Sequence, residues 1–191
     1  QKKFPSFNIF ETGYLKYDKL WLKKIILKKN KKYKKNNKKI FLSLSGFVKN
    51  KHNHSKFIQQ IKDIMDVCTQ IPKLEICVRC HPTTDNLELK KILSLYSKKK
   101  WKLVNENQLN LIRNSDICVT LFSSASILDC LALKKVPIEL WDVRKKTVNR
   151  SKFSKLNLAF SVKDKIDFKD KVNSLLNEKK FSNKKIYIKK N

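Results

Sequence analysis

Glycine, proline and arginine are scarce in this chain. Only two of its 191 residues are glycine and four are proline, which argues against a disordered chain or a long flexible linker. No run approaches the roughly 18 apolar residues of a membrane span, so no such helix is predicted. The first residue is Gln1 rather than Met, so we expect a fragment whose N-terminal part is missing. The length fits one domain with a sizeable core.

The positive charge is large but carried almost entirely by lysine. The formal net charge is +29, and only four of the 45 basic residues are arginine. Proteins that hold nucleic acid usually use arginine for bidentate and stacked contacts. A chain rich in Lys and Asn and poor in Gly, Pro and Arg is typical of an AT-rich genome, which requires no ligand. We favour this compositional explanation over nucleic-acid binding, and attraction to an anionic membrane or substrate remains open.

The five cysteines are an odd number and fall inside expected strands and helices, which indicates a reducing, cytoplasmic compartment. Cys77 and Cys80, followed by His81, match the Cys-x-x-Cys-His pattern of haem attachment. A strand alternates its side chains, however, so these groups would not face one cofactor. A zinc site lacks a second cysteine pair, and His52 and His54 lie in a polar surface loop without further ligands. We expect buried thiols, no metal and no cofactor.

Short apolar runs alternate with stretches of helical spacing along the chain. This alternation predicts an α/β fold, namely a Rossmann-like parallel sheet with helices on both faces in a single domain. We expect an N-terminal segment 1–39 of helix and mobile basic linker (28–39), a sheet domain 40–178 with an irregular basic loop at 141–155, and a basic tail 179–191. The expected strands are 40–45, 74–80, 101–104, 116–122, 136–140 and 158–162. The expected helices are 17–28, 57–71, 87–96, 108–114, one that follows Ser124 and ends at Lys134-Lys135, and 166–176.

The stretch from Ser115 to Leu140 is the most informative. An apolar strand runs directly into Ser123 and Ser124, a helix follows, and a second strand starts near Val136, which makes a βαβ unit. Its serine turn lies at the carboxyl edge of the sheet, where ligands bind. Free N–H groups at a helix N-terminus would favour phosphate there. The alternative is that the serines only cap the helix.

Three loops follow strands and should meet at one crevice. They carry Ser43, Ser45 and Gly46, then His81, then the Ser123–Ser124 turn. Each candidate has a second interpretation: His81 as a surface turn residue, and Arg79 as a phosphate ligand or part of a surface ion pair. Asp129, one turn into the helix, either faces the crevice or is solvated.

Three segments resemble GT-B transferases. Residues 13–20, GYLKYDKL, look like a Gly-x-Pro-Arg-x-Asp-x-Leu segment, and residues 78–82, VRCHP, resemble a strand that ends in Arg/Lys-x-His-Pro. Residues 116–138 are similar to an Asp-x-x-x-Ser-Ser-x-x-x-Asp/Glu helix followed by Lys-Pro-x-Ile. The families in question are CDP-glycerol glycerophosphotransferase-like and capsule or surface-carbohydrate biosynthesis enzymes. The resemblance covers about residues 8–145 and is strongest in its last third.

This resemblance implies that the chain is the donor-nucleotide-binding, C-terminal half of a glycosyl- or glycerophosphotransferase. It would act in cell-surface polysaccharide or teichoic-acid-like synthesis, at the inner face of the membrane, with a CDP- or UDP-linked donor and a lipid-linked or polymeric glycan acceptor. A nucleic-acid-binding domain and a UDP-sugar epimerase-like enzyme of the same fold remain alternatives.

The resemblance also assigns roles to single residues. His81 would act catalytically near the phosphates, Ser123 and Ser124 would hold the diphosphate, and Asp129 would face the nucleoside. Further donor contacts are expected from Arg79, Ser45 and Gly46.

Overall fold

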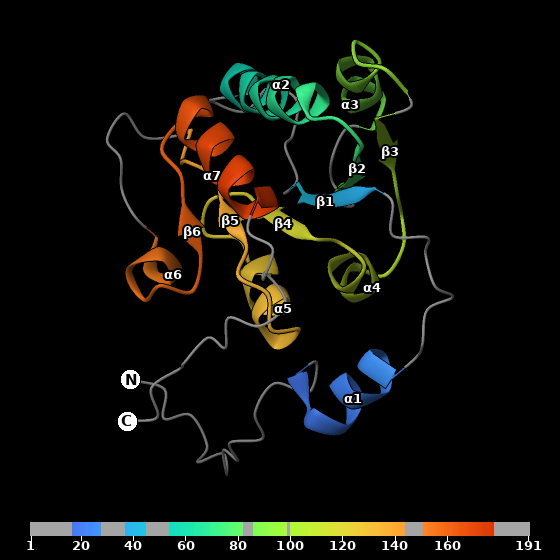
Figure 1. Cartoon of the computed structure of the whole chain (residues 1–191), viewed down its shortest axis with the longest axis vertical. Helices are drawn as coiled ribbons and strands as arrows, with labels where there is room; N and C mark the ends of the chain where they lie inside the picture. Colours follow the sequence, from blue (N-terminus) through green and yellow to red (C-terminus); the bar gives the residue numbers. More distant parts are fainter. Residues whose placement is uncertain are drawn as a thin grey trace, which may run out of the picture.

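The computed structural model describes residues 17–27, 37–44, 54–81, 86–98, 100–143 and 151–177. It forms one α/β layered unit (Figure 1). Ser45 and Gly46, the tail after Asn177 and most of the 28–39 linker lie outside the described residues.

The centre of the molecule is a six-stranded sheet with strand order β3-β2-β1-β4-β5-β6. Every neighbouring pair is parallel, which confirms the expected Rossmann-like sheet. The chain order reverses between β1 and β4, so the carboxyl ends of these strands form the switch point where such sheets bind ligands. The strand bounds are β1 (Lys38–Ser43), β2 (Leu74–Arg79), β3 (Trp101–Leu103), β4 (Ile117–Thr120), β5 (Ile138–Glu139) and β6 (Phe160–Ser161).

Helices cover both faces of the sheet, as the alternating pattern predicted (Figure 1). On β1, Ile40 and Leu42 belong to one buried cluster, whereas Phe41 belongs to a second. Helices α2, α3 and α7 pack on the first cluster, and α4 and α5 pack on the second. The helix bounds are α1 (Lys19–Leu27), α2 (His54–Gln70), α3 (Asn86–Leu93), α4 (Gln108–Arg113), α5 (Ser126–Ala132), α6 (Lys152–Lys155) and α7 (Lys165–Asn177).

Two segments expected to be irregular contain regular structure. The basic linker was expected to reach residue 39, but β1 already begins at Lys38, because Lys38 and Lys39 continue the ladder opposite Leu74 and Glu75. The prediction of an irregular loop over 141–155 was wrong at its C-terminal end, where α6 forms. Its N-cap is Ser151, whose hydroxyl accepts a hydrogen bond from the Ser154 backbone N–H, and a four-residue helix is too short to show an apolar period.

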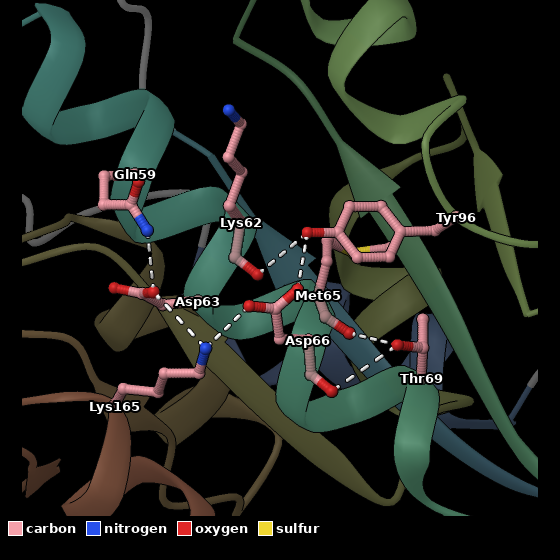
Figure 2. A network of polar contacts seen from close by, with 8 residues as sticks. All are labelled: Gln59, Lys62, Asp63, Met65, Asp66, Thr69, Tyr96 and Lys165. Atoms are coloured by element: carbon pink, nitrogen blue, oxygen red, sulfur yellow. Dashed lines mark hydrogen bonds and ion pairs between the residues drawn. The ribbon is translucent and has the colours of Figure 1, made fainter.

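A polar network fastens α7 to α2 (Figure 2). Lys165 Nζ lies 2.6 Å from Asp66 Oδ2 and 3.6 Å from Asp63 Oδ1. The Tyr96 hydroxyl donates to the other Asp66 oxygen at 2.8 Å. The Lys165 contact lowers the pKa of Asp66 and raises that of Lys165, so each charge stabilises the other. In the described part of the chain, no helix is long and apolar enough to cross a bilayer.

Candidate functional site at the switch point

A hydrogen bond between two serine hydroxyls spans the switch point. Ser43 is the last residue of β1, and its hydroxyl lies 2.9 Å from that of Ser126, the first residue of α5. Ser43 is paired in register with Arg79 on β2 and Thr120 on β4. The carboxyl ends of the three central strands are thus linked to the start of the helix that follows β4.

Gln108, the first residue of α4, is the hub of this edge. Its amide nitrogen donates to Ser126 Oγ at 3.0 Å and to Asp129 Oδ2 at 2.6 Å. Its amide oxygen accepts from Arg79 Nη1 at 2.8 Å. One side chain therefore joins β2, α4 and α5. Arg79 also donates from Nε to the Glu106 carbonyl at 3.2 Å, so these contacts are not the surface ion pair that was one of its two interpretations.

Asp129 is buried rather than solvated. Only 1% of its surface is exposed, and its second oxygen, Oδ1, accepts from the Tyr17 hydroxyl at 2.8 Å. Tyr17 stands just before α1, whose first turn is held by Asp18, since Asp18 Oδ1 accepts from the Leu20 N–H at 2.8 Å. A buried carboxylate is tolerated when neutral donors satisfy its oxygens. Asp129 therefore holds α1, α4 and α5 together.

The Ser123–Ser124 turn does not cap the helix in the expected way. The helix α5 begins two residues later, and its N-cap is Ala125, which makes no side-chain capping bond. Ser124 Oγ accepts from the Ser126 N–H at 3.3 Å. Ser123 is exposed and has a left-handed backbone with φ 54°. Its N–H donates to Glu139 Oε1 at 2.8 Å, so this donor is already engaged within the protein.

Glu139, at the end of β5, is a second buried carboxylate at the same edge, with an exposed fraction of 0%. Its Oε2 accepts from the Ser151 hydroxyl at 2.7 Å and from the Ser154 hydroxyl. Together with the Ser123 contact, these bonds tie the serine turn to the N-terminal turn of α6.

Within the described residues, the cysteines and histidines do not come together at one site. Cys77 lies in the second core cluster, whereas Cys80 packs against the first, as alternation along a strand requires. Burial raises the pKa of the Cys68 thiol to about 12 and that of Cys80 to about 11. Over the ranges that the structure describes, no three His, Cys, Asp or Glu side chains could hold a metal ion. His54 is not a loop residue: it starts α2, and its Nε2 lies 2.9 Å from Glu88 Oε1.

No protein-family model and no curated protein match this chain. Solved structures do match. UDP-GlcNAc 2-epimerase of Methanocaldococcus jannaschii, in complex with UDP-GlcNAc and UDP, aligns with a TM-score of 0.53 and 22% identity, over 75% of this chain and 40% of its own. The S. aureus MnaA–UDP co-structure aligns with a TM-score of 0.54 and 13% identity, over 76% and 39%.

A glycosyltransferase also shares the architecture. The glycotransferase of kitacinnamycin aligns with a TM-score of 0.51 and 14% identity, over 78% of this chain and 37% of its own. The chain has a GT-B Rossmann-like fold. At these identities the likeness concerns the fold alone, and the chain spans 37–40% of the length of these three structures.

In this GT-B Rossmann-like domain, some of the expected site residues lie together at the carboxyl edge of the sheet. Arg79 and Asp129 join one network, and the Ser123–Ser124 turn lies at the same carboxyl edge. His81 is exposed, two residues beyond β2, and Ser45 and Gly46 fall outside the described residues.

Sequence reasoning missed several residues of this edge. Their polar types were visible, but only strand register and helix starts bring them together. The missed residues are Tyr17, Gln108, Ser126 and Glu139.

Proposed function

We propose that the switch-point edge binds the diphosphate of a nucleotide-activated donor, and that this chain is the donor-binding part of a GT-B transferase. The observation that carries the proposal is the Gln108-centred network, which fixes Arg79, Ser126 and Asp129 at the reversal of strand order. Ligands of open parallel sheets bind at this place. The neighbours solved with UDP or UDP-GlcNAc have the same fold, which supports a nucleotide-sugar ligand.

Each residue has a part in the proposed mechanism. An acceptor hydroxyl attacks the activated donor. With a sugar donor the bond between the sugar and the diphosphate breaks, and the nucleoside diphosphate leaves with both bonding electrons. With a glycerophosphate donor the bond between the two phosphates breaks, and the nucleoside monophosphate leaves with both electrons. His81 and Arg79 offset the negative charge that develops on this leaving group. The Ser124 hydroxyl donates to a phosphate oxygen. Asp129, whose two oxygens accept from Tyr17 and Gln108, supports the donor site by positioning Gln108 and not by touching the nucleoside. A base outside this chain takes the acceptor proton, because a GT-B cleft is built from two halves.

The substrate assignment follows the resemblance of the Ser123–Ser124 and His81 segments to surface-glycan enzymes. We propose a CDP- or UDP-linked sugar or glycerophosphate donor, and a lipid-linked or polymeric glycan acceptor at the inner face of the membrane. Lysine-rich surfaces would favour an anionic membrane there. An epimerase-like enzyme is the second candidate, because one of these structural neighbours is a UDP-GlcNAc 2-epimerase solved with UDP-GlcNAc and UDP. Conversion of a UDP-sugar to its 2-epimer without any acceptor would favour the epimerase.

The test is thermal stability against CMP, CDP, UDP, GDP and a short oligonucleotide, at low and high salt. A ligand at 100 times its dissociation constant adds about 2.7 kcal/mol of stability. We expect a salt-resistant shift with one nucleoside diphosphate. A shift with the oligonucleotide alone, lost in salt, would instead indicate nucleic-acid binding.

Ser124→Asp should abolish this shift and leave the fold intact, because an aspartate can still accept the Ser126 N–H while its charge repels phosphate. The matched control is Ser97→Asp, which adds the same charge at an exposed position before β3, at the opposite edge of the sheet. Equal nucleotide affinity in both variants would remove the phosphate site from the serine turn.

A further inference from the structure

The serine turn has a conformation that its sequence does not favour. Ser123 has φ 54°, a region that is costly for residues with a Cβ and free of that cost for glycine. Something in the surroundings must therefore hold the turn. Its backbone N–H donates at 2.8 Å to Glu139 Oε1, and this is a charge-assisted bond of the strong kind.

Glu139 is itself held rigidly. It is fully buried, and it belongs to β5, whose backbone pairs with β4 and β6. Its Oε2 accepts from the Ser151 and Ser154 hydroxyls, which belong to the first turn of α6. The carboxylate thus has one oxygen on the serine turn and the other on α6. Both oxygens are engaged by groups of the protein itself, which separates Glu139 from groups that would contact a substrate.

We propose that Glu139 is a positioning residue for the phosphate turn: it holds Ser123 in the left-handed conformation, so that Ser124 faces the switch point. The proposal rests on the function proposed above and adds a residue that neither motif nor resemblance indicated. It also divides the two serines. The Ser123 N–H serves the clamp, and Ser124 is left to serve the ligand.

This role makes a distinctive prediction about rescue. Glu139→Ala removes the acceptor, so the turn should leave the left-handed region and nucleotide affinity should fall about tenfold, which corresponds to about 1.4 kcal/mol. Ser123→Gly adopts the same backbone without cost. The double variant should therefore bind within about threefold of Ser123→Gly alone. Glu139→Gln keeps an acceptor oxygen of the same shape and should stay within about threefold of the wild type.

The matched control is Asp116→Ala. Asp116 Oδ2 also accepts a backbone N–H, that of Lys39 at 2.8 Å, but at the amino edge of the sheet. Its loss should leave nucleotide affinity unchanged. Amide hydrogen exchange at Ser123 in the absence of ligand supplies a second readout, and it should accelerate in Glu139→Ala and not in Asp116→Ala.

The outcomes separate the clamp from the proposed function. Unchanged affinity and unchanged Ser123 exchange in Glu139→Ala would overturn the clamp and leave nucleotide binding intact. A loss of affinity that Ser123→Gly does not rescue would also overturn it, because the effect would then be general destabilisation. If the wild type binds no nucleotide at all, the proposed function fails. Faster Ser123 exchange in Glu139→Ala would then still support the clamp, and unchanged exchange would reject it.

Discussion

The hydrogen bond between Tyr17 and Asp129 should determine whether α1 stays packed against the rest of the domain. Tyr17→Phe removes only the hydroxyl that donates to Asp129 Oδ1 at 2.8 Å and keeps the ring. A hydrogen bond to a charged group contributes about 1.5–3 kcal/mol. Since Tyr17 is half-buried and water can partly replace its hydroxyl, we expect about 1.5 kcal/mol. For a chain of this length that is a fall in Tm of about 3–6 °C.

Tyr96→Phe is the matched control for this measurement. It also deletes a hydroxyl that donates to a carboxylate at 2.8 Å, that of Asp66. The Asp66 side chain is 37% exposed, whereas Asp129 is 1% exposed. Water can replace the donor on Asp66 far more easily, so the control should cost less than about 1 kcal/mol.

Differential scanning calorimetry and amide hydrogen exchange together test the reasoning. Tyr17→Phe should speed exchange in α1, including the Leu22 N–H that bonds the Asp18 carbonyl, and leave the central strands protected. A loss of stability no larger than that of Tyr96→Phe, with α1 exchange unchanged, would refute the claim that Asp129 anchors α1.

Two further predictions concern charge and thiol chemistry. Lys165→Met should cost about 0.5–1 kcal/mol at pH 7, because the paired side chains are 43% and 37% exposed. The pKa of Asp66 is lowered by folding, so its stabilisation is present above its ordinary value of 3.8 and is lost as pH falls. Urea titrations should therefore show that the loss of stability in Lys165→Met shrinks below about pH 4. Lys169→Met, on the next turn of α7, should show no loss of stability that depends on pH. For the thiol, burial raises the pKa of Cys80 from 9.0 to about 11. Iodoacetamide at pH 8 should thus modify native Cys80 about 100-fold more slowly than an unfolded cysteine, and equal rates would contradict that shift.

The sheet was readable from the sequence because its strands are buried on both faces. Strands such as 40–43 and 117–120 are nearly unbroken apolar runs that only a covered parallel sheet accommodates. The segments with helical spacing between these strands predicted helical crossovers, which place helices on both faces of a parallel sheet. Short elements escaped: α6 has four residues and is set by the Ser151 cap, which no periodicity reveals.

Only part of the site could be predicted from the sequence, because its polar groups form hydrogen bonds with one another. Ser123 and Ser124 were identified as a ligand turn, yet one N–H is bound by Glu139, and the helix starts after Ala125. Sequence shows which residues can donate and accept, but not which of them are already engaged with each other. Gln108 is the clearest example. Its role follows from α4 starting beside α5, a contact between elements that no local pattern encodes.

The Gln108 network has a consequence for how the domain folds. Its members come from segments that are up to 112 residues apart along the chain, the separation of Tyr17 and Asp129. Such distant groups meet only after the intervening strands have paired, and closing long loops is slow. We therefore expect the edge that would bind a donor to form late in folding, after the central strands have paired. A ligand bound at this edge would stabilise the whole folded domain. Protection from proteolysis should therefore extend to all strands and not only to the residues that the ligand touches.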